Sequence, residues 1–153
     1  MARLLYSPTS PYSAKVRMAA AWLDLPVETE TVNTGDEPAV LIDSNPLGKI
    51  PTLILDDGSA LFDSRAIMQE LDRMGGRKLY PRNAQKRMEA ERLEALADGI
   101  CDTLLAQVYE KRFRPAEKVH QPWLDLQARK AARGLDWLND NAPRVTSKLT
   151  GGQ

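Results

Sequence analysis

Two proline-containing segments constrain the fold of this chain more than any other feature. In the first, residues 10–13 read Ser-Pro-Tyr-Ser and follow a short apolar run. A serine before a proline is typical of a helix start, because serine caps free N–H groups and proline tolerates the first helical position. In the second, residues 48–51 read Gly-Lys-Ile-Pro and lead into a predicted strand. Together they predict an α/β unit at the N-terminus.

The first 80 residues alternate between strand and helix patterns. We predict strands over residues 3–7, 27–32, 52–55 and 59–62, and helices over residues 11–24 and 64–74. Residues 33–48 are rich in turn formers and predict a loop with one short helical turn. This order of elements predicts a thioredoxin-like domain with a mixed four-stranded sheet, βαβ followed by ββα.

The second half of the chain predicts an all-α domain. Residues 83–112 contain no proline, and a further helix follows Pro122. Apolar residues at helical spacing mark a stripe on each helix, comprising Met88, Leu93, Ala97, Ile100, Leu104 and Val108 on the first, and Leu124, Ala128, Ala131, Leu135 and Leu138 on the second. We therefore predict two domains, residues 1–78 and 84–153.

Composition narrows the class of protein. With 42% apolar and 27% charged residues the chain reads as soluble and globular, and its formal net charge of zero argues against nucleic acid or an anionic membrane as partner. No stretch approaches the roughly 20 apolar residues of a membrane span. Cys101 is the single cysteine, so no intrachain disulfide forms and a cytoplasmic location is expected. His120, Cys101 and the acidic residues lack ligand spacing, so we predict no metal site.

Three segments, residues 7–13, 45–53 and 62–67, together resemble the cytosolic-type glutathione S-transferases, and in particular serine-type, bacterial-like members. Residues 10–13 are similar to the Cys-Pro-Tyr-Cys redox motif of glutaredoxins with serine at both cysteine positions. Residues 45–53 resemble the cis-proline segment of the same fold. The resemblance covers the whole chain, strongly in the first 80 residues and only generically afterwards. It implies glutathione binding without dithiol chemistry.

The resemblance implies that Ser10 donates a hydrogen bond to the glutathione thiolate. A serine at a helix N-terminus suits this role, because the helix dipole and a hydroxyl both favour an anion there. The competing interpretation is a plain N-cap. Tyr6, near the end of the first strand, remains a rival for the same role. We expect Tyr12 to pack over the site or at the domain interface, and Ser13 to be a first-turn helix residue.

The other glutathione contacts are expected from two loops. A cis Ile50–Pro51 bond would present the backbone of Ile50 to the cysteinyl part of glutathione, in the manner of a strand pairing with a sheet edge. Lys49 would reach the glycyl carboxylate. Ser64 at a helix start would hold the γ-glutamyl carboxylate, and Asp63 would pair with the adjacent ammonium. The competing interpretations are an ordinary trans proline, a solvated lysine and a helix cap.

The implied activity is conjugation of glutathione to a small electrophile by a homodimer, with Arg65 in a salt bridge across the dimer. Two alternatives remain open at this point: a non-catalytic adaptor, and a glutathione-dependent isomerase, dehalogenase or disulfide reductase. Asp98 and Asp102 lie one helical turn apart, and we predict that they occupy a solvated face.

The sequence departs from the family pattern at its C-terminal end. Family members continue with a buried core helix and further helices, whereas this sequence ends at Gln153. We therefore expect a partial helical domain that lacks the C-terminal helices and exposes an apolar face.

Overall fold

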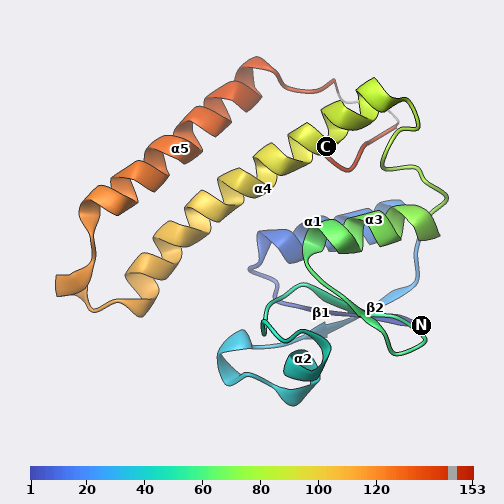
Figure 1. The fold of residues 1–153 in the computed structure, drawn as a ribbon, viewed down its shortest axis with the longest axis horizontal. Coiled ribbons are helices and arrows are strands. Elements are labelled where there is room, and N and C mark those ends of the chain that lie inside the picture. The colour runs from blue at the N-terminus through green and yellow to red at the C-terminus, as the bar shows by residue number, and fades with distance from the viewer. Residues whose placement is uncertain (145–147) are drawn as a thin grey trace. The chain divides into compact units, whose positions relative to one another are not determined.

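The computed structural model describes residues 1–144 and 148–153 of the chain. It divides into two compact units, Met1–Tyr80 and Pro81–Gln153 (Figure 1). Each unit is described by itself below. Over the described residues, no helix combines the length and the apolar character needed to cross a membrane.

The N-terminal unit is built on a four-stranded sheet in the order β2-β1-β3-β4. Its elements are β1 (Ala2–Tyr6), α1 (Pro11–Trp22), β2 (Val27–Thr31), the 3-10 turn η1 (Thr34–Asp36), α2 (Ala39–Ser44), β3 (Thr52–Ile54), β4 (Ala60–Leu61) and α3 (Ser64–Met74). Strands β1 and β2 are parallel, whereas β3 is antiparallel to both β1 and β4. The predicted thioredoxin-like domain with a mixed sheet is confirmed.

Alternation along β1 divides the apolar residues of this unit between the two faces of the sheet. Leu4 faces α1 and α3 and joins the larger core, whose other fully buried members include Val16, Leu53 and Ile67. Leu5 points to the opposite face and packs with residues that include Leu41 of α2. Figure 1 shows α1 and α3 on one side of the sheet and α2 on the other. Both faces of the central strand are therefore covered.

The segment between β2 and β3 is more ordered than the sequence predicts. The expected loop with one short turn contains both η1 and α2. Leu41 has no exposed surface, and its burial beneath the sheet holds α2 in place even though no side chain caps this helix. Strand β2 is an outer strand of the sheet and has no fully buried residue. Glu30 in β2 instead accepts a hydrogen bond from Arg3 (2.9 Å).

The helical unit consists of two long antiparallel helices, α4 (Ala84–Phe113) and α5 (Gln121–Asp140), joined through the 3-10 turn η2 (Ala116–Lys118) (Figure 1). Asn83 caps α4 by accepting the N–H of Lys86 (3.0 Å). The helices approach closely at Gly134, where an added Cβ would lie 2.6 Å from the Ile100 side chain.

The predicted stripe on α4 is wrong at three of its six positions, whereas Leu93 and Ala97 are partly buried. Ile100 is buried, but Met88, Leu104 and Val108 are exposed. The buried positions of α4 include Glu94 and Asp98, which correspond to no apolar periodicity. On α5, Leu124 and Ala131 are buried as predicted, whereas Leu135 is exposed. A pair of helices shares only one seam, so a 30-residue helix leaves much of its surface uncovered.

Candidate functional site

The register of the sheet brings the three predicted site segments to the same end of its strands. Leu5, at the end of β1, lies opposite Thr52, at the start of β3. Leu53 lies opposite Leu61, the last residue of β4. Because β3 runs antiparallel to both neighbours, the end of β1, the start of β3 and the end of β4 lie at the same end of the sheet. The loops that carry Ser10, Pro51 and Ser64 therefore leave the sheet side by side.

Ser10 forms the N-cap of α1. Its Oγ accepts the backbone N–H of Ser13 (3.2 Å), and its own N–H donates to the carbonyl of Ser7 (3.1 Å). Pro11 occupies the first helical position, as predicted. Ser10 is only half-buried, so its hydroxyl proton stays free to donate to a ligand at the positive end of the helix.

Tyr6, the rival for the thiolate contact, has a packing role in the structure. Its ring lies against the larger core, and the guanidinium carbon of Arg17 stands 4.7 Å from the ring centroid. A cation over the face of an aromatic ring is attracted to the ring quadrupole, which fixes the orientation of both side chains. The nearby hydroxyls of Ser7 and Thr9 are bonded to each other (3.0 Å).

The Ile50–Pro51 bond is cis, as predicted, and a buried asparagine braces the loop around it. Asn45 is 1% exposed, and its amide donates to the carbonyl of Lys49 (2.8 Å) and to Oγ1 of Thr52 (3.3 Å). Its Oδ1 accepts the N–H of Leu47 (3.0 Å). Sequence reasoning missed this brace, because an Asn-Pro pair is equally typical of an exposed turn.

Ile50 and Lys49 carry groups that the protein itself leaves open. The backbone N–H and carbonyl of Ile50 have no hydrogen-bond partner among the residues that the structure describes. Ile50 is followed directly by Pro51 and then by β3, so these two backbone groups lie just before the first residue of that strand. The side chain of Lys49 is exposed and forms no ion pair within the described ranges.

Asp63 and Ser64 form the start of α3. Asp63 is exposed and caps the helix by accepting the N–H of Arg65 (3.0 Å). The preceding Phe62–Asp63 bond is also cis. Ser64 is the first helical residue, and it is buried with 4% of its surface exposed. The predicted N-cap therefore belongs to Asp63, while Ser64 lies where helical N–H groups lack partners inside the helix.

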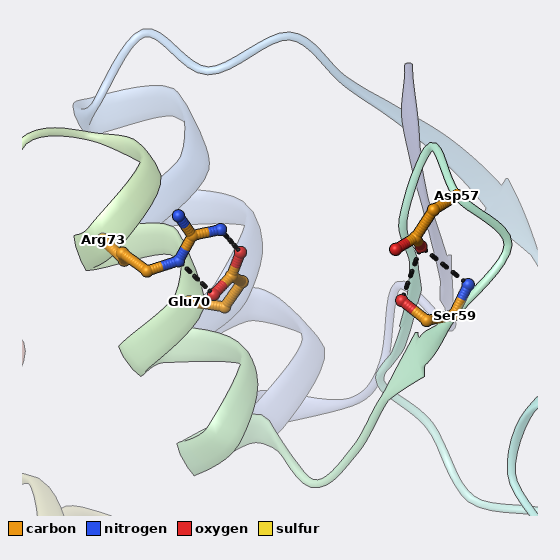
Figure 2. Close-up of polar contacts among 4 residues, drawn as sticks. All are labelled: Asp57, Ser59, Glu70 and Arg73. Atoms are coloured by element: carbon orange, nitrogen blue, oxygen red, sulfur yellow. Dashed lines mark hydrogen bonds and ion pairs between the residues drawn. The ribbon is translucent and has the colours of Figure 1, made fainter.

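The residues of the N-terminal unit whose pKa values are shifted lie away from the three site segments, and Figure 2 shows their polar contacts. Hydrogen bonds from the hydroxyl and the N–H of Ser59 lower the pKa of Asp57 in the β3–β4 turn, at the opposite end of these strands. In the second half of α3, Arg73 donates to Glu70, which lowers the pKa of Glu70 and raises that of Arg73. The groups at the candidate site that can stabilise an anion are the helix N-termini, the serine hydroxyls and the Lys49 ammonium.

In the helical unit, two aromatic residues and two aspartates of α4 differ in their exposure. Tyr109 and Phe113, on α4, are exposed and in edge-on contact, with ring centroids 5.2 Å apart. Asp98, expected on a solvated face, is instead 4% exposed, whereas Asp102 is exposed as predicted. Apolar periodicity does not predict a buried carboxylate at this position of α4.

Comparison with known proteins adds independent information. A family model described as "Glutathione S-transferase, N-terminal domain" matches residues 4–78. A glutathione S-transferase from Methylobacillus flagellatus KT, solved with glutathione bound, is 36% identical and superposes with a TM-score of 0.91 over 99% of this chain and 77% of that one. A glutathione transferase family member from Pseudomonas fluorescens Pf-5, with bound glutathione, is 37% identical with a TM-score of 0.83, over 93% of this chain and 72% of that one.

A sequence relative is the uncharacterized GST-like protein YibF of Escherichia coli (strain K12). It is 38% identical over 95 residues, which amount to 61% of this chain and 46% of YibF. The match thus spans less than half of the YibF chain. Like the family model, it gives no information on the remaining part.

Proposed function

Because the chain belongs to the glutathione S-transferase family, we propose that it binds glutathione, stabilises its thiolate and conjugates it to a small electrophile. One observation carries the proposal: three polar loop segments lie together at the same end of the strands. The chain that holds them is 36% identical to a glutathione S-transferase solved with glutathione bound. Glutathione presents a thiol, a peptide and two carboxylates, and the three segments offer a complementary group for each.

The thiolate is assigned to the N-terminus of α1, next to Ser10. A free thiol has a pKa of about 8.5, and lowering it by two units requires roughly 2.7 kcal/mol of selective stabilisation of the anion. A charge-assisted hydrogen bond contributes about 1.5–3 kcal/mol, and a helix N-terminus about 0.3–1 kcal/mol. Ser10 and α1 are together sufficient, and the packing of Tyr6 under Arg17 supports Ser10 over Tyr6.

The peptide and carboxylates of glutathione are assigned to the other two segments. The open backbone groups of Ile50 would pair with the cysteinyl residue, as an added strand pairs with a sheet edge. Lys49 would neutralise the glycyl carboxylate. The α3 N-terminus with Ser64 would bind the γ-glutamyl carboxylate, and the exposed Asp63 carboxylate would pair with the neighbouring ammonium.

With the thiolate held, the reaction is a nucleophilic attack of sulfur on an electrophilic carbon. The enzyme contributes anion stabilisation and the positioning of the nucleophile. A homodimer in the cytoplasm is part of the same proposal. The family favours the two-fold dimer, and the single cysteine favours the cytoplasm.

Calorimetric titration of reduced glutathione into the whole chain tests the proposal. We expect saturable binding, weakened roughly tenfold or more in Ser64→Ala by loss of one hydrogen bond to a carboxylate. Ser10→Ala should retain binding but lower turnover of an activated aryl halide about ten- to a hundredfold. Ser59→Ala, a serine at the opposite end of the strands, serves as the matched control and should behave as wild type. Absence of binding by folded wild-type protein would reject the proposal.

The helical unit favours one second candidate, a non-catalytic interaction protein. Its large apolar side chains Leu104, Val108, Phe113 and Leu135 are 45–67% exposed. Exposed apolar groups of this size suit contacts with another protein. A folded chain that neither binds glutathione nor turns over electrophiles would favour this candidate over the transferase.

A further inference from the structure

Ser13, one helical turn beyond Ser10, is buried although its hydroxyl forms no hydrogen bond. It has no exposed surface, and its Oγ is the one buried side-chain polar atom without a hydrogen-bond partner in the described part of the chain. Leaving a hydroxyl buried and unbonded destabilises a fold, and alanine would fill the same space without that cost.

The position of Ser13 links it to the Ser10 hydroxyl. The Ser13 N–H already donates to Ser10 Oγ (3.2 Å), which fixes the two residues as the N-cap and third residue of the same turn. In a helix the Cα–Cβ bond tilts towards the N-terminus, so the Ser13 side chain leans back over the turn that Ser10 begins. A rotation about one side-chain bond moves a serine hydroxyl between its staggered positions.

We propose that Ser13 is a positioning residue for Ser10: its hydroxyl donates to Ser10 Oγ while Ser10 donates its own proton to the glutathione sulfur. Ser10 Oγ then accepts from both the N–H and the O–H of Ser13. Hydrogen bonds in such a chain polarise one another, so a second donor to Ser10 strengthens the bond from Ser10 to the thiolate. This inference rests on the proposed function and adds a second residue to its thiolate site.

A double-mutant cycle in the whole chain tests it. The bound thiol is titrated with pH by the ultraviolet absorbance of the thiolate, and turnover is measured at neutral pH, for wild type, Ser13→Ala, Ser10→Ala and the double variant. We expect Ser13→Ala to raise the pKa of the bound thiol, lower turnover about two- to tenfold, and unfold at a denaturant concentration no lower than wild type. In the Ser10→Ala background the same substitution should have no effect on either readout.

Ser13→Gly provides a second variant, because it also removes the hydroxyl and introduces no additional thiol into the titration. It should reproduce the Ser13→Ala titration. The inference is overturned if Ser13→Ala titrates like wild type, or if it lowers turnover equally with and without Ser10. Wild type that binds no glutathione would instead reject the proposed function itself, and this inference with it.

Discussion

The two units of this chain differ in how completely they cover their apolar side chains. In the N-terminal unit both faces of the sheet are packed, and Leu4, Leu5 and Leu53 have no exposed surface. In the helical unit α4 and α5 share one seam, and several large apolar residues remain exposed. The first unit therefore holds its loops on a continuous core, whereas the second depends on a single helix pair.

This difference matters for function because the candidate site lies entirely on the well-packed unit. The loops after β1, before β3 and after β4 are fixed by strand register on one side and by caps or braces on the other. The proposed role of the site, which is to hold a thiolate within hydrogen-bond distance, requires such rigidity.

The largest expected difference between the units is in the cost of removing a leucine. Leu53→Ala should lower the free energy of unfolding by about 3 kcal/mol, because it leaves a cavity between the sheet and its helices. Leu104→Ala, at a residue 45% exposed, should cost less than about 1 kcal/mol. Urea denaturation of both variants measures this. Equal losses would mean that Leu104 is covered in solution, and the contrast between the units would fail.

The same contrast explains which parts of the fold the sequence could predict. Proline, glycine and capping residues mark the ends of elements in the N-terminal unit, and the predicted helix from residue 64 to 74 matches α3 in full. On α4 the prediction depended on apolar spacing alone. Such spacing does not predict that Glu94 and Asp98 are buried, because the burial of a charged residue depends on what packs against it in the fold.

A smaller but more informative effect is expected at Asn45. Asn45→Ala removes one acceptor and two donors from the loop that carries the cis Ile50–Pro51 bond. We expect a loss of about 2 kcal/mol in stability, since the carbonyl of Lys49 and the N–H of Leu47 lose a partner. Glutathione affinity should fall as well, and calorimetry measures both effects on one sample. Unchanged affinity despite lower stability would show that the brace supports the fold without positioning the site.

Asn45 also illustrates what could not be predicted about the site. The residues proposed to contact glutathione, such as Ser10, stand out in sequence because proline or glycine accompanies them. Buried residues that support the site loops do not stand out in this way. Asp72 is comparable to Asn45: it is buried at the end of α3 and accepts the N–H groups of Leu79 (2.6 Å) and Tyr80 (3.3 Å). In both cases the partners are fixed by the fold, so a polar residue in a loop or helix gives no signal.

Two glycines in the middle of helices sharpen the description of the helical unit. Gly134→Ala would place a Cβ 2.6 Å from Ile100, so overpacking of roughly 1–3 kcal/mol should outweigh the gain in helix propensity. Gly99→Ala meets no atom within 4 Å and should instead stabilise the protein by roughly 0.5–1 kcal/mol. Thermal unfolding of the pair measures the difference. If Gly134→Ala were as stable as Gly99→Ala, the helix seam would be looser than the structure shows.

The smallest expected effect is electrostatic, at the corner between α4 and α5. Arg114 Nε donates to Glu110 (2.7 Å) and the His120 N–H donates to the same carboxylate (3.2 Å), and these bonds lower the pKa of Glu110 below its ordinary value of 4.5. A lowered pKa means that the folded state favours the carboxylate. Its stabilising contribution is therefore complete above pH 4.5 and is lost as the pH falls through the lower, folded-state pKa.

Glu110→Gln should accordingly lose less stability than wild type when the pH is lowered from about 6 to about 3. Asp57→Asn gives the matched measurement in the N-terminal unit, because hydrogen bonds from Ser59 lower the pKa of Asp57 in the same direction. Both effects should be small, because Asp57 is exposed and, although the Glu110 side chain is only 9% exposed, its partner Arg114 is 56% exposed. Denaturant midpoints at the two pH values, compared with wild type, measure them. A pH dependence identical to wild type in Glu110→Gln, but reduced in Asp57→Asn, would show that the corner between α4 and α5 is not held in solution.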